Sequence, residues 1–147
     1  MAIPDQIAGQ ISAAAARRFG GIARLYGAPA LARLGQAHIC VIGIGGVGSW
    51  AAEGLARSGV GRLTLIDLDH VAESNLNRQI HAVEDTLGQA KVLAMKDRIA
   101  AIHPACEVTA IEEFVTPDNV ADVLPRCDAV VDAIDQVRAK AALIVHC

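Results

Sequence analysis

The feature that most constrains the fold is a short apolar run that leads through a glycine-rich loop into a helical pattern. Residues 38–42 read His-Ile-Cys-Val-Ile, and residues 43–48 read Gly-Ile-Gly-Gly-Val-Gly. A continuous apolar run of this length is typical of a parallel strand that is buried on both faces. Residues 46–58 then repeat apolar side chains at helical spacing and end before Gly59, a helix stop. A strand, a glycine loop and a helix in this order predict the first unit of a parallel α/β sheet.

The same alternation continues along the chain. Further strands are predicted over 62–66, 107–111 and 128–134. Helices are predicted from Thr86, which forms a capping box with Gln89, to residue 102, from the cap at Thr116 and Pro117 to Leu124, and after residue 135. This pattern indicates an α/β, Rossmann-like doubly wound parallel sheet with right-handed crossovers. We expect the strand order 3-2-1-4 and a ligand crevice at the carboxyl ends of the first and fourth strands.

The length of 147 residues predicts one sheet domain, over residues 37–147, behind an N-terminal helical extension over residues 1–36. Two helices are predicted in that extension, over 6–19 and 30–34. The fourth strand has the apolar composition of a central strand, and an uncovered apolar edge is an aggregation risk. We therefore expect the domain to be truncated on its C-terminal side, and this chain alone to catalyse no turnover.

Composition narrows the class of protein further. No apolar run approaches the roughly 20 residues of a membrane-spanning helix, and the N-terminus lacks the order of a secretory signal. These two observations predict no membrane association. The 4 cysteines form no CxxC pair, which predicts buried thiols in the reducing cytoplasm. With a net charge of -3 the chain has no overall attraction to nucleic acid, so any RNA contact needs a local patch.

Two features of the predicted crevice indicate a nucleotide. Glycines let the main chain approach phosphates, and the following helix offers free N–H groups; the alternative is a tight structural turn. Asp67 ends the second strand, where an acid accepts hydrogen bonds from ribose hydroxyls; the alternative is a solvated acid at a strand end. Neither feature distinguishes NAD from ATP, because both ligands carry ribose and phosphate.

Cations after the ribose acid favour a triphosphate. A triphosphate under attack needs positive charge on its departing phosphates. Arg78 and Lys91 are the nearest cations that follow Asp67. Either one alone is typical of a surface charge, but together with Asp67 and the glycines they are better explained as a phosphate clamp.

Two carboxylates flank the end of the fourth strand. Magnesium prefers one or two carboxylates together with phosphate oxygens and water, so Asp135 is predicted to bind Mg²⁺. The alternative for Asp135 is a helix N-cap. For Asp132 we favour a cap or a contact near the ribose over a metal.

Together these residues resemble the ThiF/MoeB/HesA family of ubiquitin-activating-type adenylating enzymes. The motifs that carry the resemblance are Gly43-x-Gly-Gly-x-Gly48, Asp67-x-Asp69, Ser74-Asn75-x-x-Arg78-Gln79, Lys91 and Asp135. Further strings resemble its tRNA-modifying members, over 18–27, 42–52, 77–81, 114–120 and 132–135. Relatives continue well beyond the point where this chain ends, with a substrate-facing half and, in many members, a reactive cysteine or paired zinc ligands.

The resemblance implies that residues 37–147 form an ATP-binding adenylation domain. ATP with Mg²⁺ would activate the carboxylate of threonylcarbamoyladenosine beside the tRNA anticodon, and cyclisation would then expel AMP. The nucleotide-binding residues that the resemblance implies are Gly43, Gly45, Gly46, Gly48, Asp67, Asp69, Asn75, Arg78, Gln79 and Lys91, with Asp135 on Mg²⁺. Arg78 and Lys91 would also act in catalysis.

The resemblance further implies a homodimer, a tRNA substrate and a sulfur-transfer protein as a partner. Some members place an arginine finger from the partner subunit where this chain has Gly21. Arg18 and Arg24 are the neighbouring candidates for this finger, and of the two we predict that Arg18 acts in catalysis.

Two other functions stay open. The first is adenylation of the C-terminal glycine of a small sulfur-carrier protein by the same nucleotide site. The second is a NAD-binding oxidoreductase domain, which is favoured only if Arg78 and Lys91 are incidental. Exchange of isotope between pyrophosphate and ATP separates both adenylating functions from the oxidoreductase.

Overall fold

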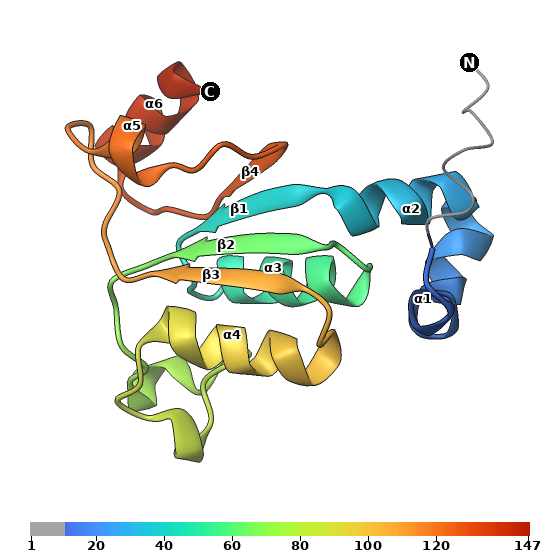
Figure 1. Cartoon of the computed structure of the whole chain (residues 1–147). Helices are drawn as coiled ribbons and strands as arrows, with labels where there is room; N and C mark the ends of the chain where they lie inside the picture. Colours follow the sequence, from blue (N-terminus) through green and yellow to red (C-terminus); the bar gives the residue numbers. More distant parts are fainter. Residues whose placement is uncertain (1–10) are drawn as a thin grey trace.

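A parallel four-stranded sheet forms the centre of the molecule (Figure 1). The structure is a computed structural model that describes residues 11–147. The strands are β1 (His38–Ile42), β2 (Arg62–Ile66), β3 (Glu107–Ile111) and β4 (Ala129–Asp132), in the order β3-β2-β1-β4. The predicted order 3-2-1-4 is confirmed. The fourth strand is shorter than the predicted 128–134, because its pairing with β1 ends where Asp132 meets Ile42.

Helices cover both faces of the sheet, as predicted for a doubly wound fold. On one face lie α3 (Gly48–Arg57) and α4 (Lys91–Ile102), and on the other lie α5 (Val120–Val123) and α6 (Val137–His146) (Figure 1). Val41 of β1 packs into the core under α3 and α4, whereas its neighbour Ile42 packs into the core under α5 and α6. Successive strand side chains point to opposite faces, so a strand covered on both sides is apolar throughout.

Two helices precede the sheet and lie beyond the amino ends of its strands (Figure 1). They are α1 (Ala13–Tyr26) and α2 (Ala28–Gln36), joined at Gly27 with a φ of 90°. The predicted end of the first helix at Phe19 is wrong: the backbone kinks there, at φ -117° and ψ 18°, and the helix continues beyond it. The predicted start of that helix, at residues 6–10, lies outside the described residues.

The predicted helix start at Thr86 is also wrong. Thr86 closes a 3-10 turn over Glu84–Thr86, and its hydroxyl donates to the His81 carbonyl oxygen at 2.8 Å. Gly88 then reverses the chain with a φ of 82°, and α4 begins at Lys91. The hydroxyl that would cap a helix is therefore committed to a turn inside the loop between β2 and α4.

Candidate functional site

A crevice of about 670 Å³ opens at the carboxyl ends of the strands. Its position is the one expected for ligand binding in a sheet whose strand order reverses between β1 and β4. The predicted site residues that line it are Gly43, Gly45, Gly46, Asp67, Asp69, Asn75, Arg78, Gln79, Lys91 and Asp135. The structure therefore brings together residues from five separate segments of the chain.

The glycines of the loop after β1 divide into two pairs. A Cβ on Gly43 would lie 2.7 Å from the Ala133 carbonyl oxygen, and one on Gly48 would lie 1.7 Å from the Gly43 carbonyl oxygen. These two glycines are required by the close approach of main chains, which matches the structural-turn alternative. A Cβ on Gly45 or Gly46 would contact only the side chains of Gln79 or Arg78, at 3.4 Å or more. The second pair therefore forms the floor of the crevice beneath two polar side chains.

Helix α3 starts directly at the end of this loop. Its N-cap residue, Val47, provides no side-chain hydrogen bond to the first turn. The Ser49 N–H of the first turn already donates to the Gly45 carbonyl oxygen at 3.1 Å. The other N–H groups at the start of a helix have no partner within the helix, and the positive end of the helix dipole adds to their attraction for anions. The arrangement suits a phosphate group placed over Gly45 and Gly46.

Asp67 connects the end of β2 to the glycine loop. Its Oδ2 atom accepts a hydrogen bond from the Ile44 N–H at 2.6 Å, and its Oδ1 atom accepts one from the Asp69 N–H at 2.9 Å. Each carboxylate oxygen keeps a second lone pair for another donor. The Asp67 carboxylate is thus fixed in direction and can still accept from a ribose hydroxyl, so its predicted role stays a prediction.

The two predicted phosphate cations occupy different environments. Arg78 is exposed, its side chain lies against Gly46, and its Nη1 atom donates to the Ser74 carbonyl oxygen at 2.9 Å. Lys91 is only 6% exposed, and its Nζ atom lies 3.2 Å from Oδ2 of Asp69. A buried lysine held by an acid beside a crevice differs from an ordinary solvated surface charge. Asp69 contacts Lys91 and thereby fixes its ammonium group at the crevice.

Gln79 and Asn75 are the buried amides of the crevice. Asn75 uses Oδ1 to accept from the Ala72 N–H at 2.9 Å, which shapes the loop. Gln79 is 5% exposed, and its Oε1 atom is buried without a hydrogen-bond partner among residues 11–147. A buried amide oxygen without a partner is unfavourable by roughly 1–3 kcal/mol. Gln79 therefore fits a polar ligand that completes its hydrogen bonding.

The two acids at the end of β4 have different surroundings: Asp132 is the last residue of the strand and Asp135 follows it. Asp135 is exposed and lines the crevice, and the N-cap of α6 is Gln136 rather than Asp135, so the cap alternative is not seen. One carboxylate ligand, here that of Asp135, is compatible with Mg²⁺, which takes its other oxygens from phosphate and water. Asp132 does not line the crevice, so the structure does not place it at a ribose. Its Oδ1 atom accepts from the Ile134 N–H at 3.1 Å and so caps the main chain just after β4, in part as predicted. Its Oδ2 atom lies 2.7 Å from Nζ of Lys140, because α6 packs back over the end of β4.

The last predicted catalytic residue, Arg18, lies at the opposite edge of the sheet. Its Nη1 atom donates to the carbonyl oxygen of Ile102 at 3.0 Å, at the C-terminal end of α4. Cations are favoured at this position by the helix dipole. Arg18 does not line the crevice of its own chain. A role as a finger from a second copy stays a prediction.

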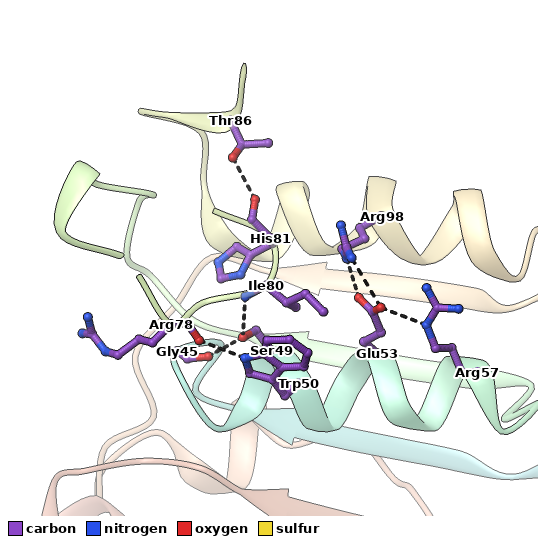
Figure 2. Close-up of polar contacts among 10 residues, drawn as sticks. All are labelled: Gly45, Ser49, Trp50, Glu53, Arg57, Arg78, Ile80, His81, Thr86 and Arg98. Carbon is purple, nitrogen blue, oxygen red and sulfur yellow. Dashed lines mark hydrogen bonds and ion pairs between the residues drawn. The ribbon is translucent and has the colours of Figure 1, made fainter. Parts of the chain in front are cut away.

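Sequence reasoning assigned no role to several residues that line or support the crevice. Phe114 and Val115 line it after the third strand, where the carboxyl end of β3 reaches the same edge. The sequence could have indicated them, because residues that directly follow any strand of a parallel sheet lie at the same edge as the crevice. Ser49 and Trp50 belong to the first turn of α3 and contact the segment that carries Arg78 (Figure 2).

Behind the crevice, charged and titratable side chains join α3 to α4 (Figure 2). Glu53 of α3 accepts hydrogen bonds from Arg57 and from Arg98 of α4. Burial raises the pKa of Glu53, but the bonds from the two arginines outweigh it and the net shift is downward. His81 is 2% exposed, and burial, with the charges of Lys91 and Arg98, lowers its pKa to about 4. His81 is therefore neutral at pH 7.

Known proteins are similar to this chain over most of its length. The ThiF family matches residues 19–147. The tRNA threonylcarbamoyladenosine dehydratase of Escherichia coli (strain K12) is 59% identical over 138 residues, which cover 93% of this chain and 52% of that protein. The molybdopterin-synthase adenylyltransferase of Salmonella typhimurium (strain LT2) is 36% identical over 114 residues, which cover 78% of this chain and 46% of that protein.

A solved structure shares the fold. The crystal structure of the E. coli dehydratase in complex with ATP matches with a TM-score of 0.91 at 59% identity, covering 93% of this chain and 57% of that one. The chain thus spans about half the length of the proteins it matches. Among residues 11–147, none of the helices has the length and apolar character needed to cross a membrane.

Proposed function

The chain belongs to the ThiF family, and from this premise we propose that it is the ATP-binding part of an enzyme that adenylates threonylcarbamoyladenosine in tRNA. The activated carboxylate would then cyclise with loss of AMP. The observation that carries the proposal is the position of Arg78 and Lys91 beside the glycine loop and Asp67 in one crevice. Similarity to the E. coli dehydratase supports the tRNA nucleoside as the substrate.

The residues of the crevice divide the work on the nucleotide. Gly45, Gly46 and the first turn of α3 bind phosphate through main-chain N–H groups, and Asp67 accepts from the ribose. Arg78 and Lys91 stabilise the negative charge that develops on the departing pyrophosphate. Cations that are already in position lower the activation free energy without having to rearrange during the reaction. Among the described residues Asp135 would hold Mg²⁺, which neutralises phosphate charge when it is bound.

The acceptor half of the reaction needs parts outside this crevice. We propose that residues 37–147 form the adenylation domain and residues 1–36 an N-terminal extension, whose helices α1 and α2 contact a second copy. In such a dimer Arg18 or Arg24 of one copy would reach the crevice of the other. Cytoplasmic localisation follows from a tRNA substrate. A sulfur-transfer protein as a partner stays a prediction.

Adenylation of a sulfur-carrier protein is the second candidate function. Similarity to a molybdopterin-synthase adenylyltransferase favours it, at 36% identity. The NAD-binding alternative has less support. Lys91 is buried at the crevice in addition to Arg78, and the glycine loop can hold the pyrophosphate of a dinucleotide without two cations.

Isotope exchange tests the proposal. The complete protein is incubated with ATP, Mg²⁺ and labelled pyrophosphate, and either tRNA bearing threonylcarbamoyladenosine or a carrier protein with a C-terminal glycine is added. We expect label to enter ATP only with the modified tRNA. Exchange only with the carrier protein would support the second candidate, and binding of NAD without ATP would contradict both.

A further inference from the structure

The first turn of α3 holds a distant loop segment by two hydrogen bonds (Figure 2). The indole Nε1–H of Trp50 donates to the carbonyl oxygen of Arg78 at 2.9 Å. The hydroxyl of Ser49 accepts from the N–H of Ile80 at 3.4 Å and donates to the carbonyl oxygen of Gly45 at 2.5 Å. Two adjacent residues of one helix therefore join residues 78–80 to the glycine loop.

The held groups belong to the two peptide bonds on either side of Gln79. The carbonyl of Arg78 is in the peptide bond before Gln79, and the N–H of Ile80 is in the peptide bond after it. Fixing both planes restricts the backbone dihedrals of Gln79 and therefore the direction of its side chain. Ser49 is fully buried, so water does not compete for its hydroxyl.

The segment held in this way carries two groups that face the crevice. Gln79 has a buried Oε1 atom without a partner, and its Nε2 atom lies 3.7 Å from the place of a Cβ on Gly45. The Arg78 side chain lies 3.4 Å from the corresponding place on Gly46. Each side chain thus lies over one glycine of the phosphate loop, and both positions depend on the same main-chain segment.

We propose that Ser49 and Trp50 are positioning residues that hold the segment 78–80 on the glycine loop and thereby set the preference of the site for a triphosphate. The inference rests on the proposed function, because only ATP binding gives Arg78 a β- or γ-phosphate to contact. AMP lacks those phosphates, so its binding depends less on the position of Arg78.

Three substitutions in the complete protein test the inference. Trp50→Phe keeps an aromatic ring and removes the N–H donor, whereas Ser49→Ala removes the hydroxyl. Ser58→Ala is the matched control: its hydroxyl donates to the Gly54 carbonyl oxygen at 2.8 Å in the last turn of the same helix, away from the loop. It makes the same bond to the fourth preceding carbonyl that Ser49 makes to Gly45.

Amide hydrogen exchange without nucleotide tests whether the segment is held. We expect peptides spanning residues 76–82 to exchange about three to ten times faster in Trp50→Phe and Ser49→Ala, the range that the net value of one hydrogen bond predicts. Exchange in β1 and β2 should not change, and Ser58→Ala should match the wild type throughout. Unchanged exchange of residues 76–82 in both variants would overturn the inference, whatever the nucleotide.

The ratio of the dissociation constants for ATP and AMP tests the consequence for the site. We expect Trp50→Phe to weaken ATP binding about three- to tenfold and to leave AMP binding nearly unchanged. A merely structural role would weaken both nucleotides equally and would overturn the inference. A wild-type protein that binds no ATP would contradict the proposed function and the triphosphate preference together, while hydrogen exchange would still decide whether the segment is held.

Discussion

At the scale of single residues, the guanidinium of Arg78 stands out because it lies over Gly46 while its side chain remains exposed. Arg78→Ala removes positive charge from the proposed pyrophosphate position and leaves no cavity in a core. We expect kcat/KM for adenylation to fall about 10²- to 10³-fold, as for loss of one preorganised donor. The free energy of unfolding should change by less than about 0.5 kcal/mol. Steady-state kinetics and urea unfolding measure the two quantities.

Lys96→Ala provides the control for Arg78→Ala. Lys96 is an exposed cation on α4 that does not line the crevice, so its loss tests the general effect of one positive charge. We expect its kinetics to match the wild type. Near-normal turnover of Arg78→Ala would count heavily against the proposed role of Arg78.

Asp67 offers a second test, because it lies at the junction of the glycine loop and β2. Asp67→Ala removes the acceptor of the Ile44 N–H and the proposed acceptor of the ribose hydroxyl together. We expect ATP and AMP to bind about tenfold more weakly, by a similar factor for both, since both carry ribose. Calorimetry with ATP, AMP and 2′-deoxy-ATP measures this. A variant that binds all three nucleotides as tightly as the wild type refutes the ribose assignment.

The positions of residues at the crevice were predictable where the order of strands along the chain alone decides them. Asp67 follows a buried strand directly, so the strand pattern places its carboxylate at the crevice. Asp132 also lies at a strand end, yet its direction depends on Lys140, which reaches it only because of the way α6 packs. The hydrogen bond from Trp50 to Arg78 joins residues 28 apart in sequence, and no spacing rule indicates it.

At the scale of elements, the loop between β1 and α3 contains glycines with separate functions. Gly48→Ala would place a Cβ 1.7 Å from the Gly43 carbonyl oxygen, so main chains must move apart. We expect it to destabilise the fold by about 2–3 kcal/mol, as other overpacked sites do. Gly45→Ala meets only the Gln79 side chain, at 3.7 Å, and should unfold near the wild-type temperature while binding ATP more weakly.

Thermal unfolding and ATP binding of the two glycine variants are measured side by side. Equal loss of stability in Gly45→Ala and Gly48→Ala would contradict the division of the loop into packing and crevice positions. Binding of ATP by Gly45→Ala with wild-type affinity would show that the methyl group does not enter the phosphate position.

The elements themselves were predictable to different degrees. The predicted bounds of β1, β2 and β3 agree with the structure because continuous apolar runs bounded by turns leave little choice of position. The start of α4 was missed because the Thr86 hydroxyl can cap either a helix or a 3-10 turn. Tertiary contact decides between them, since the hydroxyl bonds the carbonyl oxygen of buried His81.

At the scale of the whole molecule, titratable groups behind the crevice and at the C-terminal end of α4 make the free energy of unfolding depend on pH. Glu53, Arg57 and Arg98 connect α3 to α4, and neutral His81 is buried next to them (Figure 2). Hydrogen bonds from the two arginines lower the pKa of Glu53 in spite of its burial. Burial and the charge of Arg18 lower the pKa of His103. Because their pKa values are lowered in the folded protein, Glu53, His81 and His103 all bind protons more readily in the unfolded chain.

We therefore expect the free energy of unfolding to fall as the pH is lowered from 7. The pKa of His81 is lowered from 6.5 to about 4, so its contribution is complete above pH 6.5 and is lost progressively toward pH 4. The loss of unfolding free energy from protonation of His81 amounts to about 3 kcal/mol for a pKa shift of that size. His103 acts in the same direction, and Glu53 adds a further loss below its ordinary pKa of 4.5.

His81→Gln isolates the histidine term, because the amide is polar but does not titrate. We expect the free energy of unfolding of this variant, measured with urea between pH 4.5 and pH 7.5, to depend less on pH than that of the wild type. His70→Gln, which changes an exposed histidine, serves as the control and should keep the wild-type dependence. If His81→Gln loses stability with falling pH as steeply as the wild type, the buried imidazole is not the group that titrates. In that case Glu53 and His103 would have to account for the whole effect.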